Sequence, residues 1–160
     1  MSPSTSSSNA TQLCVVVISA APHAHLLPRV VRSVLASTLL PEQLIIALSG
    51  VDDTLCTGAH SSVSPIMLAA APTIEFRLLC TKQMRSSGQN RNRAAAACAA
   101  SRASTHEDAF ISFIDSDDLL LPTRLATITT LMREHRADLG LHLPSRPQTH
   151  RVQVRDAHVG

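Results

Sequence analysis

The sequence predicts an α/β fold, a three-layer α/β/α sandwich around a mainly parallel, Rossmann-like sheet. Short apolar runs rich in Val, Ile and Leu recur along its 160 residues, and segments with helical periodicity separate them. Continuous apolar runs suit strands that are buried on both faces, as the strands of a parallel sheet are. With 44% hydrophobic and only 16% charged residues, the chain has enough apolar material for one core, and a highly charged disordered chain is excluded.

The first third of the chain alternates strand, helix and strand. A Ser/Thr-rich segment, 1–12, is expected to be a disordered tail. The apolar runs 13–18 (LCVVVI) and 43–48 (QLIIAL) predict the first two strands. Between them, apolar residues over 26–35 recur at i, i+4 and i+8, which indicates an amphipathic helix that ends before Pro41.

The rest of the chain continues this alternation. A short helix is predicted over 65–71, then a strand at 74–80 and an alanine-rich helix over 90–102. A fourth strand is predicted at 110–114, an amphipathic helix over 121–132 and a fifth strand at 138–143. Together these elements define one domain, 13–143. The segment 144–160 is polar without a clear period and is expected to be an irregular tail.

The acidic segment 115–118 (DSDD) is the most distinctive feature of the sequence. Ligands of parallel α/β sheets bind beyond the carboxyl ends of the strands, which directs attention to the loops 19–25, 49–54, 81–92 and 115–122. The last of these holds Asp115, Asp117 and Asp118, three of the twelve acidic residues, directly after an apolar strand. Carboxylates this close repel one another, and a divalent cation such as Mg²⁺ or Mn²⁺ removes that repulsion and often binds substrate phosphates as well. Alternatively, Asp117 or Asp118 merely caps the next helix.

A basic segment lies at the predicted start of the alanine-rich helix. Gly88 is followed by Gln-Asn-Arg-Asn-Arg, which places Arg91 and Arg93 near free backbone N–H groups and the positive end of a helix dipole. Guanidinium groups bind phosphate oxygens through two parallel hydrogen bonds. A basic site and an acidic site at the strand ends of one sheet together favour an anionic ligand with a bridging metal. A solvated basic helix start is the alternative.

Composition and cysteine spacing limit the partners and the compartment. A net charge of +2, with no Trp, no Tyr and three Phe, argues against a nucleic-acid partner. No two cysteines have zinc-site spacing, and all four are expected to be free thiols packed as small hydrophobes. The N-terminus lacks a basic signal region, and the apolar run from residue 13 to 21 is too short for a transmembrane segment. These features predict a cytoplasmic protein.

The sequence from about 13 to 143 resembles a family 2-type glycosyltransferase with the GT-A fold, a nucleotide-diphospho-sugar transferase. Three pieces carry the resemblance: the opening strand and helix, 13–39; the segment 88–94 (GQNRNRA), which resembles the family's glycine-to-Arg-Asn segment; and 110–118 (FISFIDSDD) with Pro122 and Leu125, which resembles its metal-binding Asp-x-Asp segment. The resemblance implies an enzyme that transfers a sugar from a nucleotide-diphosphate donor to the hydroxyl of an acceptor that the sequence does not identify.

The resemblance also implies roles for particular residues. Asp117 would bind a divalent metal, Mn²⁺ or Mg²⁺, and Asp115 would contact the ribose or the shell of that metal. Arg91 would lie near the base or the diphosphate. The loop after the first strand, formed by Ser19, Ala20 and Ala21, would line the nucleotide pocket. The family usually has an aspartate directly after the second strand, but Leu48-Ser-Gly stands there, so Asp52 is the candidate substrate-binding carboxylate on that loop.

The family's catalytic base and acceptor-binding segment lie well beyond the Asp-x-Asp strand, and only 42 residues follow Asp118. No catalytic base is therefore assigned, and the chain is expected to be truncated after this region, with a partner domain supplying the acceptor site. One alternative is a truncated, non-catalytic domain of the same fold that binds a nucleotide or another protein. A third alternative is a nucleotidyltransferase. It is weaker, because the basic, glycine-rich opening loop of those enzymes is missing after Ile18.

Overall fold

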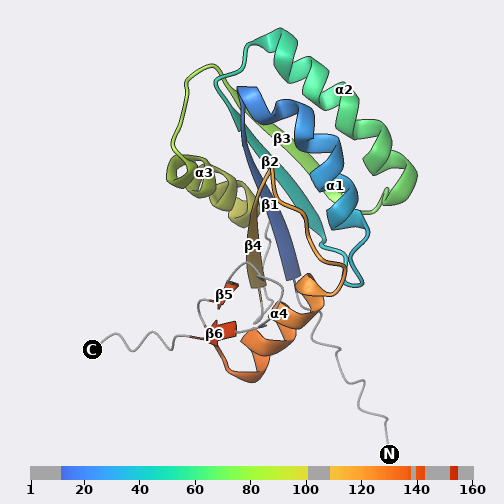
Figure 1. Ribbon diagram of the computed structural model, residues 1–160, viewed down its shortest axis with the longest axis vertical. Helices are drawn as coiled ribbons and strands as arrows, with labels where there is room; N and C mark the ends of the chain where they lie inside the picture. Colours follow the sequence, from blue (N-terminus) through green and yellow to red (C-terminus); the bar gives the residue numbers. More distant parts are fainter. Residues whose placement is uncertain (1–11, 101–108, 138–139, 143–151, 155–160) are drawn as a thin grey trace, which may run out of the picture.

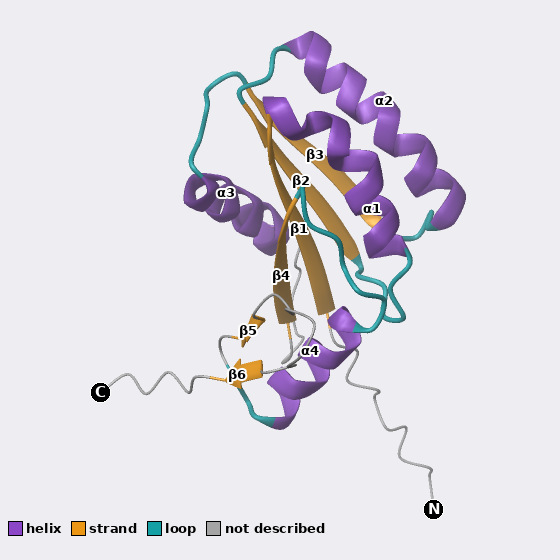
Figure 2. Cartoon of the chain, in the orientation of Figure 1, coloured by secondary structure: helices purple, strands orange, loops and turns teal. Residues whose placement is uncertain are grey.

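The computed structural model describes residues 12–100, 109–137, 140–142 and 152–154. A parallel sheet of four strands in the order β3-β2-β1-β4 forms its centre (Figures 1 and 2). The strands are β1 (Gln12–Ala20), β2 (Gln43–Ser49), β3 (Glu75–Thr81) and β4 (Ala109–Asp115). The helices are α1 (Leu27–Leu35), preceded by the 3-10 helix η1 (Ala21–Leu26), α2 (Asp53–Ala70), α3 (Ser87–Ala100) and α4 (Arg124–Glu134). This architecture confirms the predicted α/β class and the mainly parallel sheet.

The alternation of side chains along β1 separates two apolar cores. Val15 and Val17 pack with α1 and α2 on one face of the sheet, whereas Val16 and Ile18 pack against α3 on the other. Figure 1 shows α1 and α2 on one side of the sheet and α3 on the opposite side. Because helices cover both faces, β1 and β2 are almost fully buried, and the three-layer sandwich is confirmed.

The expectation of four free cysteines is wrong, because they form two disulfides. Cys14 of β1 is bonded to Cys98 of α3, and Cys56 of α2 is bonded to Cys80 of β3. The Cα–Cα distances are 6.3 and 6.1 Å, so each pair meets where a helix packs on the sheet. Disulfides persist in oxidising compartments, so the four cysteines do not support the prediction of a cytoplasmic protein. Separately, no helix in the described part of the chain is long and apolar enough to cross a bilayer.

Helix α2 is longer than the predicted helix over 65–71. It begins at Asp53 and contains Pro65 within its length. Ala59, Val63 and Met67, spaced four residues apart, form its buried face. The Asp52 side chain accepts a hydrogen bond from the first turn and caps the helix. Packing and capping therefore hold in a helix a segment whose Ser, Thr, Gly and Pro content suggests a loop.

The predicted fifth strand is not part of the parallel sheet. It is reduced to β5 (Gly140–His142), which pairs antiparallel with β6 (Val152–Val154) in a separate two-stranded sheet. β6 lies within the segment 144–160 that was expected to be irregular. The expected disordered tail, apart from the first residue of β1, lies outside the described residues, as does most of 144–160.

Candidate functional site

The carboxyl ends of β1 and β4 form the topological switch point of the sheet. The chain passes from β1 to β2 and β3 on one side, and then returns to place β4 on the other side of β1. Ligands of open α/β sheets bind in the crevice at such a point. Ile18 is in register with Asp115, and the Ser116 N–H donates a hydrogen bond of 2.9 Å to the Ile18 carbonyl. The acidic loop and Ser19–Ala21 therefore lie side by side, at the edge of the sheet where the sequence predicts both.

The acidic loop presents its carboxylates to solvent. A turn in which the Asp118 N–H donates to the Asp115 carbonyl (3.0 Å) leaves Asp117 and Asp118 exposed, while the Asp115 side chain is 44% exposed. α4 begins only at Arg124, and Thr123 stands at its cap position. The alternative that Asp117 or Asp118 caps this helix is therefore wrong, and the carboxylates of this loop are left without that structural role.

Hydrogen bonds to α1 and the turn that follows it hold the segment after the acidic loop. The Leu120 N–H donates to Ser33 Oγ (3.2 Å), and the Pro122 carbonyl accepts hydrogen bonds from the Thr38 N–H (2.8 Å) and hydroxyl (3.2 Å). Leu120 itself is buried in the core on this face. The acidic loop is thus anchored at both ends, by β4 on one side and by these contacts on the other.

Arg91 of α3 faces the acidic loop. Its Nη2 lies 3.1 Å from Asp115 Oδ1 and 3.4 Å from Oδ2, and the side chains are 40% and 44% exposed. α3 begins at Ser87, three residues before its predicted start, because Ser86 and Gln89 form reciprocal capping hydrogen bonds. Arg91 therefore lies in the second turn, within reach of β4. The structure brings the predicted basic and acidic groups together.

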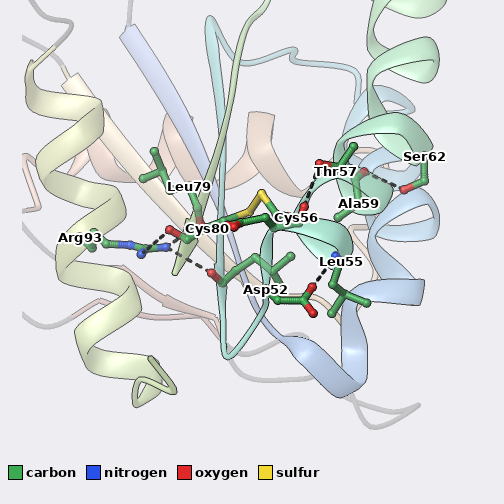
Figure 3. The surroundings of a disulfide bond; sticks show 11 residues. Asp52, Leu55, Cys56, Thr57, Ala59, Ser62, Leu79, Cys80 and Arg93 are labelled. Atoms are coloured by element: carbon green, nitrogen blue, oxygen red, sulfur yellow. Dashed lines mark hydrogen bonds between the residues drawn. A yellow bond between two sulfur atoms is a disulfide. The ribbon is translucent and has the colours of Figure 1, made fainter. Parts of the chain in front are cut away.

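Arg93 has a different environment from the one that the sequence suggests. Its Nη2 donates to the Leu79 carbonyl (2.6 Å), and its Nη1 lies 3.4 Å from the Cys80 carbonyl oxygen (Figure 3). Burial of the guanidinium lowers the pKa of Arg93, and the neighbouring Arg85 lowers it further. Arg93 thus fastens α3 to the end of β3, and the interpretation of this side chain as a phosphate clamp is wrong.

The loop after β2 offers few free polar groups. Ser49 is fully buried, and its Oγ accepts a hydrogen bond of 3.0 Å from Asn90 Nδ2. Asp52 accepts the Leu55 N–H at 2.8 Å as the cap of α2 (Figure 3). The hydrogen bond and the charge of Asp53, 2.9 Å from the Lys82 amine, raise the pKa of that exposed lysine. Sequence reasoning missed Asn90, whose position four residues before the buried Ala94 on α3 is the only signal for it.

Asp115, Asp117 and Asp118 supply carboxylate oxygens at the switch point, and Asp115 and Asp117 are the two candidate metal ligands. Among the residues that the structure describes, no group of three or more His, Cys, Asp or Glu side chains is arranged to hold a metal ion. Mg²⁺ commonly takes only one or two carboxylates from a protein and completes its coordination with substrate phosphates and water. The two aspartates fit that requirement for a phosphate-bearing ligand, and they do not fit a metal enclosed by protein alone.

No protein-family model and no curated protein matches the sequence. Among solved structures, the chain is similar to S. aureus TarS, a glycosyltransferase. A structure of TarS 1–349 has 16% identity, with a TM-score of 0.55 over 86% of this chain and 39% of that one. The structure of TarS 1–349 in complex with UDP has 17% identity and a TM-score of 0.55 over 86% and 38%. A further TarS structure has 18% identity and a TM-score of 0.50 over 86% and 23%.

The chain thus spans about two fifths or less of the TarS chains that it matches. At this level of identity the likeness concerns the fold. The four-stranded parallel sheet with its flanking helices is a glycosyltransferase-like α/β fold.

Proposed function

We propose that this chain is the donor-binding part of a glycosyltransferase. In this proposal the carboxyl edge of the sheet binds a nucleotide-diphospho-sugar, and the sugar is transferred to an acceptor hydroxyl. The observation that carries the proposal is the switch point itself, where Asp115 ends β4 and Asp117 follows it, next to Ser19–Ala21 at the end of β1 and the start of η1. This is the place where open α/β sheets bind ligands. The likeness in fold to TarS, one structure of which contains UDP, supports the same assignment.

The charges at the switch point suit a diphosphate together with a divalent cation. Asp117 is exposed, and Asp115 lies two positions before it at the end of β4, so these two side chains would hold Mn²⁺ or Mg²⁺. When bound, the ion supplies positive charge that stabilises the leaving diphosphate. Arg91 uses one guanidinium nitrogen for Asp115, and its remaining N–H groups are available for phosphate oxygens at the same edge.

The remaining candidate residues border this charged centre. Ser19, Ala20 and Ala21 lie at the end of β1 and the start of η1, where small side chains let a ligand approach the backbone closely. Asp52 follows β2, and one of its carboxylate oxygens is used to cap α2. We assign the loop after β1 to the ribose and phosphate wall, and we assign to Asp52 a contact with the ribose through its other oxygen.

Calorimetry with UDP and MnCl₂ tests this proposal. The wild-type chain is expected to bind UDP in the presence of Mn²⁺ and to bind at least tenfold more weakly in EDTA. Asp117→Asn removes one charge with little change in shape and is expected to weaken Mn²⁺-dependent binding at least tenfold. Asp118→Asn is the matched control, because Asp118 is also exposed on the same loop, and its affinity is expected to stay within twofold of wild type.

Two outcomes would contradict the proposal. One is the absence of binding for UDP, GDP and ADP with Mn²⁺ or Mg²⁺. The other is equal loss of affinity in Asp117→Asn and Asp118→Asn, which would indicate a general charge effect instead of a metal ligand. Release of free sugar from UDP-sugars by the chain, measured separately, distinguishes donor cleavage from donor binding alone.

A further inference from the structure

An apolar surface lies beside the switch point, formed by Gly50, Met84 and Ala21. Met84 is 60% exposed although it is a large apolar side chain. A Cβ built on Gly50 would lie 2.7 Å from Met84 Cε and 3.9 Å from the Ala21 Cβ, so the thioether covers the glycine next to the end of β1. The Met84 Sδ is also 4.0 Å from Ser49 Oγ. We call these three residues the Met84 surface.

Two loops are joined in a way that fixes the Met84 surface. The Gly50 N–H donates to the Gln83 carbonyl (3.3 Å), and the Val51 N–H donates to the Thr81 carbonyl (3.1 Å). The loop from β3 to α3 (Figure 2) is therefore tied to the loop after β2, which sets Met84 over Gly50. Gly50 has φ +71°, a backbone conformation that favours glycine, and the missing side chain leaves room for the Met84 methyl group.

Several polar groups near the Met84 surface are engaged within the protein. Ser49 is fully buried, with its hydroxyl bonded to Asn90. Asp52 caps α2, and Lys82 is paired with Asp53 at 2.9 Å. A flat ligand ring on the Met84 surface would meet methyl groups, a glycine backbone and a polarisable sulfur, contacts that depend little on the hydrogen-bonding edge of the base. Methionine sulfur packs favourably on aromatic rings and adapts to different shapes.

The position of the Met84 surface matches the length of a nucleoside diphosphate. Asp115 ends β4 and Asp117 follows it, Ser19–Ala21 lie at the end of β1 and the start of η1, and Gly50 follows β2. These three strands are adjacent. Two strand spacings separate β4 from β2, about 10 Å. In a nucleoside diphosphate the ribose separates the base from the diphosphate over a comparable length. A diphosphate at the acidic loop therefore places the base over the Met84 surface.

We propose that the Met84 surface packs against the base of the donor nucleotide, and that the chain consequently binds uracil, guanine and adenine nucleotides with similar affinity. This inference rests on the proposed function and names the residue that determines its base selectivity. Packing without edge recognition contributes affinity that depends on ring contact area, whereas discrimination between bases requires hydrogen-bonding groups left unpaired by the wrong base.

Calorimetric titrations of UDP, GDP, ADP and inorganic pyrophosphate, all with saturating MnCl₂, test this inference. In the wild-type chain the three nucleotides are expected to differ in Kd by less than tenfold. Met84→Ala is expected to raise the Kd of each nucleotide about two- to tenfold and to leave pyrophosphate binding unchanged, because pyrophosphate has no base. Met84→Leu keeps most of the apolar contact and should retain most of the affinity. Leu68→Ala, at a 72% exposed position on α2, is the surface control.

The outcomes separate this inference from the proposed function. A preference for one base of more than tenfold would overturn the inferred lack of base selectivity, and an unchanged nucleotide affinity in Met84→Ala would overturn the role of Met84. Asp117-dependent UDP binding, and with it the proposed function, would stand in both cases. An equal loss of nucleotide and pyrophosphate binding in Met84→Ala would also overturn it, since that pattern indicates a disturbed fold. If neither pyrophosphate nor any nucleotide binds wild type, the proposed function itself fails.

Discussion

Removal of the disulfide between Cys14 and Cys98 should destabilise the chain more than removal of the disulfide between Cys56 and Cys80. The sequence separations are 84 and 24 residues. A crosslink that closes a longer loop removes more conformational entropy from the unfolded chain. With those loop lengths the chain-entropy relation gives about 4.6 kcal/mol for the first disulfide and about 3.5 kcal/mol for the second. The expected difference is about 1.1 kcal/mol.

The double variants C14A/C98A and C56A/C80A make this comparison, because both replace two half-cystines with alanine. Burial should also make the loss of stability larger in C14A/C98A. Cys14 and Cys98 are fully buried, so their replacement by alanine leaves a cavity. Urea unfolding followed by far-ultraviolet circular dichroism is the suitable assay, because the sequence has no Trp or Tyr for fluorescence. A loss of about 4.6 kcal/mol is comparable to the whole stability of many domains. A C14A/C98A chain that is unfolded without urea, while C56A/C80A is folded, would therefore also agree with the expected order.

Equal destabilisation by the two double variants, or a larger loss in C56A/C80A, would refute the reasoning from loop length. The wild-type chain unfolded with a reducing agent present provides the reference in which both crosslinks are open. A wild-type free energy of unfolding that reduction leaves unchanged would contradict the existence of both disulfides.

Three further changes should lower the free energy of unfolding in the same assay. Arg93→Met should cost about 1–3 kcal/mol, because the carbonyl groups at the end of β3 lose their donor. Gly50→Ala should cost about 1–2 kcal/mol, since φ is +71° and the new Cβ meets Met84, and adding Met84→Ala should recover part of this loss. Ser86→Ala should cost about 1 kcal/mol, because Gln89 loses its capping partner on α3.

Leu68→Ala serves as the control for all three, with an expected change within about 0.5 kcal/mol at an exposed site. A free energy of unfolding equal to that of wild type in Arg93→Met would show that the carbonyl groups at the end of β3 hydrogen-bond to water instead. Additive losses for Gly50→Ala and Met84→Ala would rule out a clash between the two side chains. A Ser86→Ala chain as stable as wild type would mean that the cap contributes nothing to α3.

The strands of the parallel sheet could be predicted from the sequence because each is a short continuous apolar run. β1 and β2 are the clearest cases, and the structure extends neither by more than two residues at either end. Most of α2 was missed, because only three of its positions are buried and one of these is Ala59. The register of the helix against the sheet decides which small residues are buried, and no local pattern contains that information.

Only part of the candidate site could likewise be predicted from the sequence. The alternation of strands and helices, together with the resemblance to a known motif, predicted that the acidic loop and Ser19–Ala21 lie at the carboxyl edge of the sheet. The pairing of β4 with β1, which makes them neighbours, came only from the structure. The partner of Arg91 and the carbonyl contacts of Arg93 do not follow from their spacing. They depend on where α3 begins, which two capping side chains set, and on the tilt of the helix across the strand ends. Cysteine pairing is also non-local, since four cysteines permit three fully paired arrangements as well as free thiols.

The two disulfides form nested covalent rings. The loop closed by Cys56 and Cys80 lies entirely inside the loop closed by Cys14 and Cys98. A protease that cuts the backbone once between these outer cysteines therefore leaves both fragments linked, wherever in that span it cuts. Such a nicked chain keeps its mass on a non-reducing gel and separates into two pieces only after reduction. The disulfides thus keep one covalently linked unit after a single break in its backbone. This unit contains β1, α1, β2, α2, β3 and most of α3.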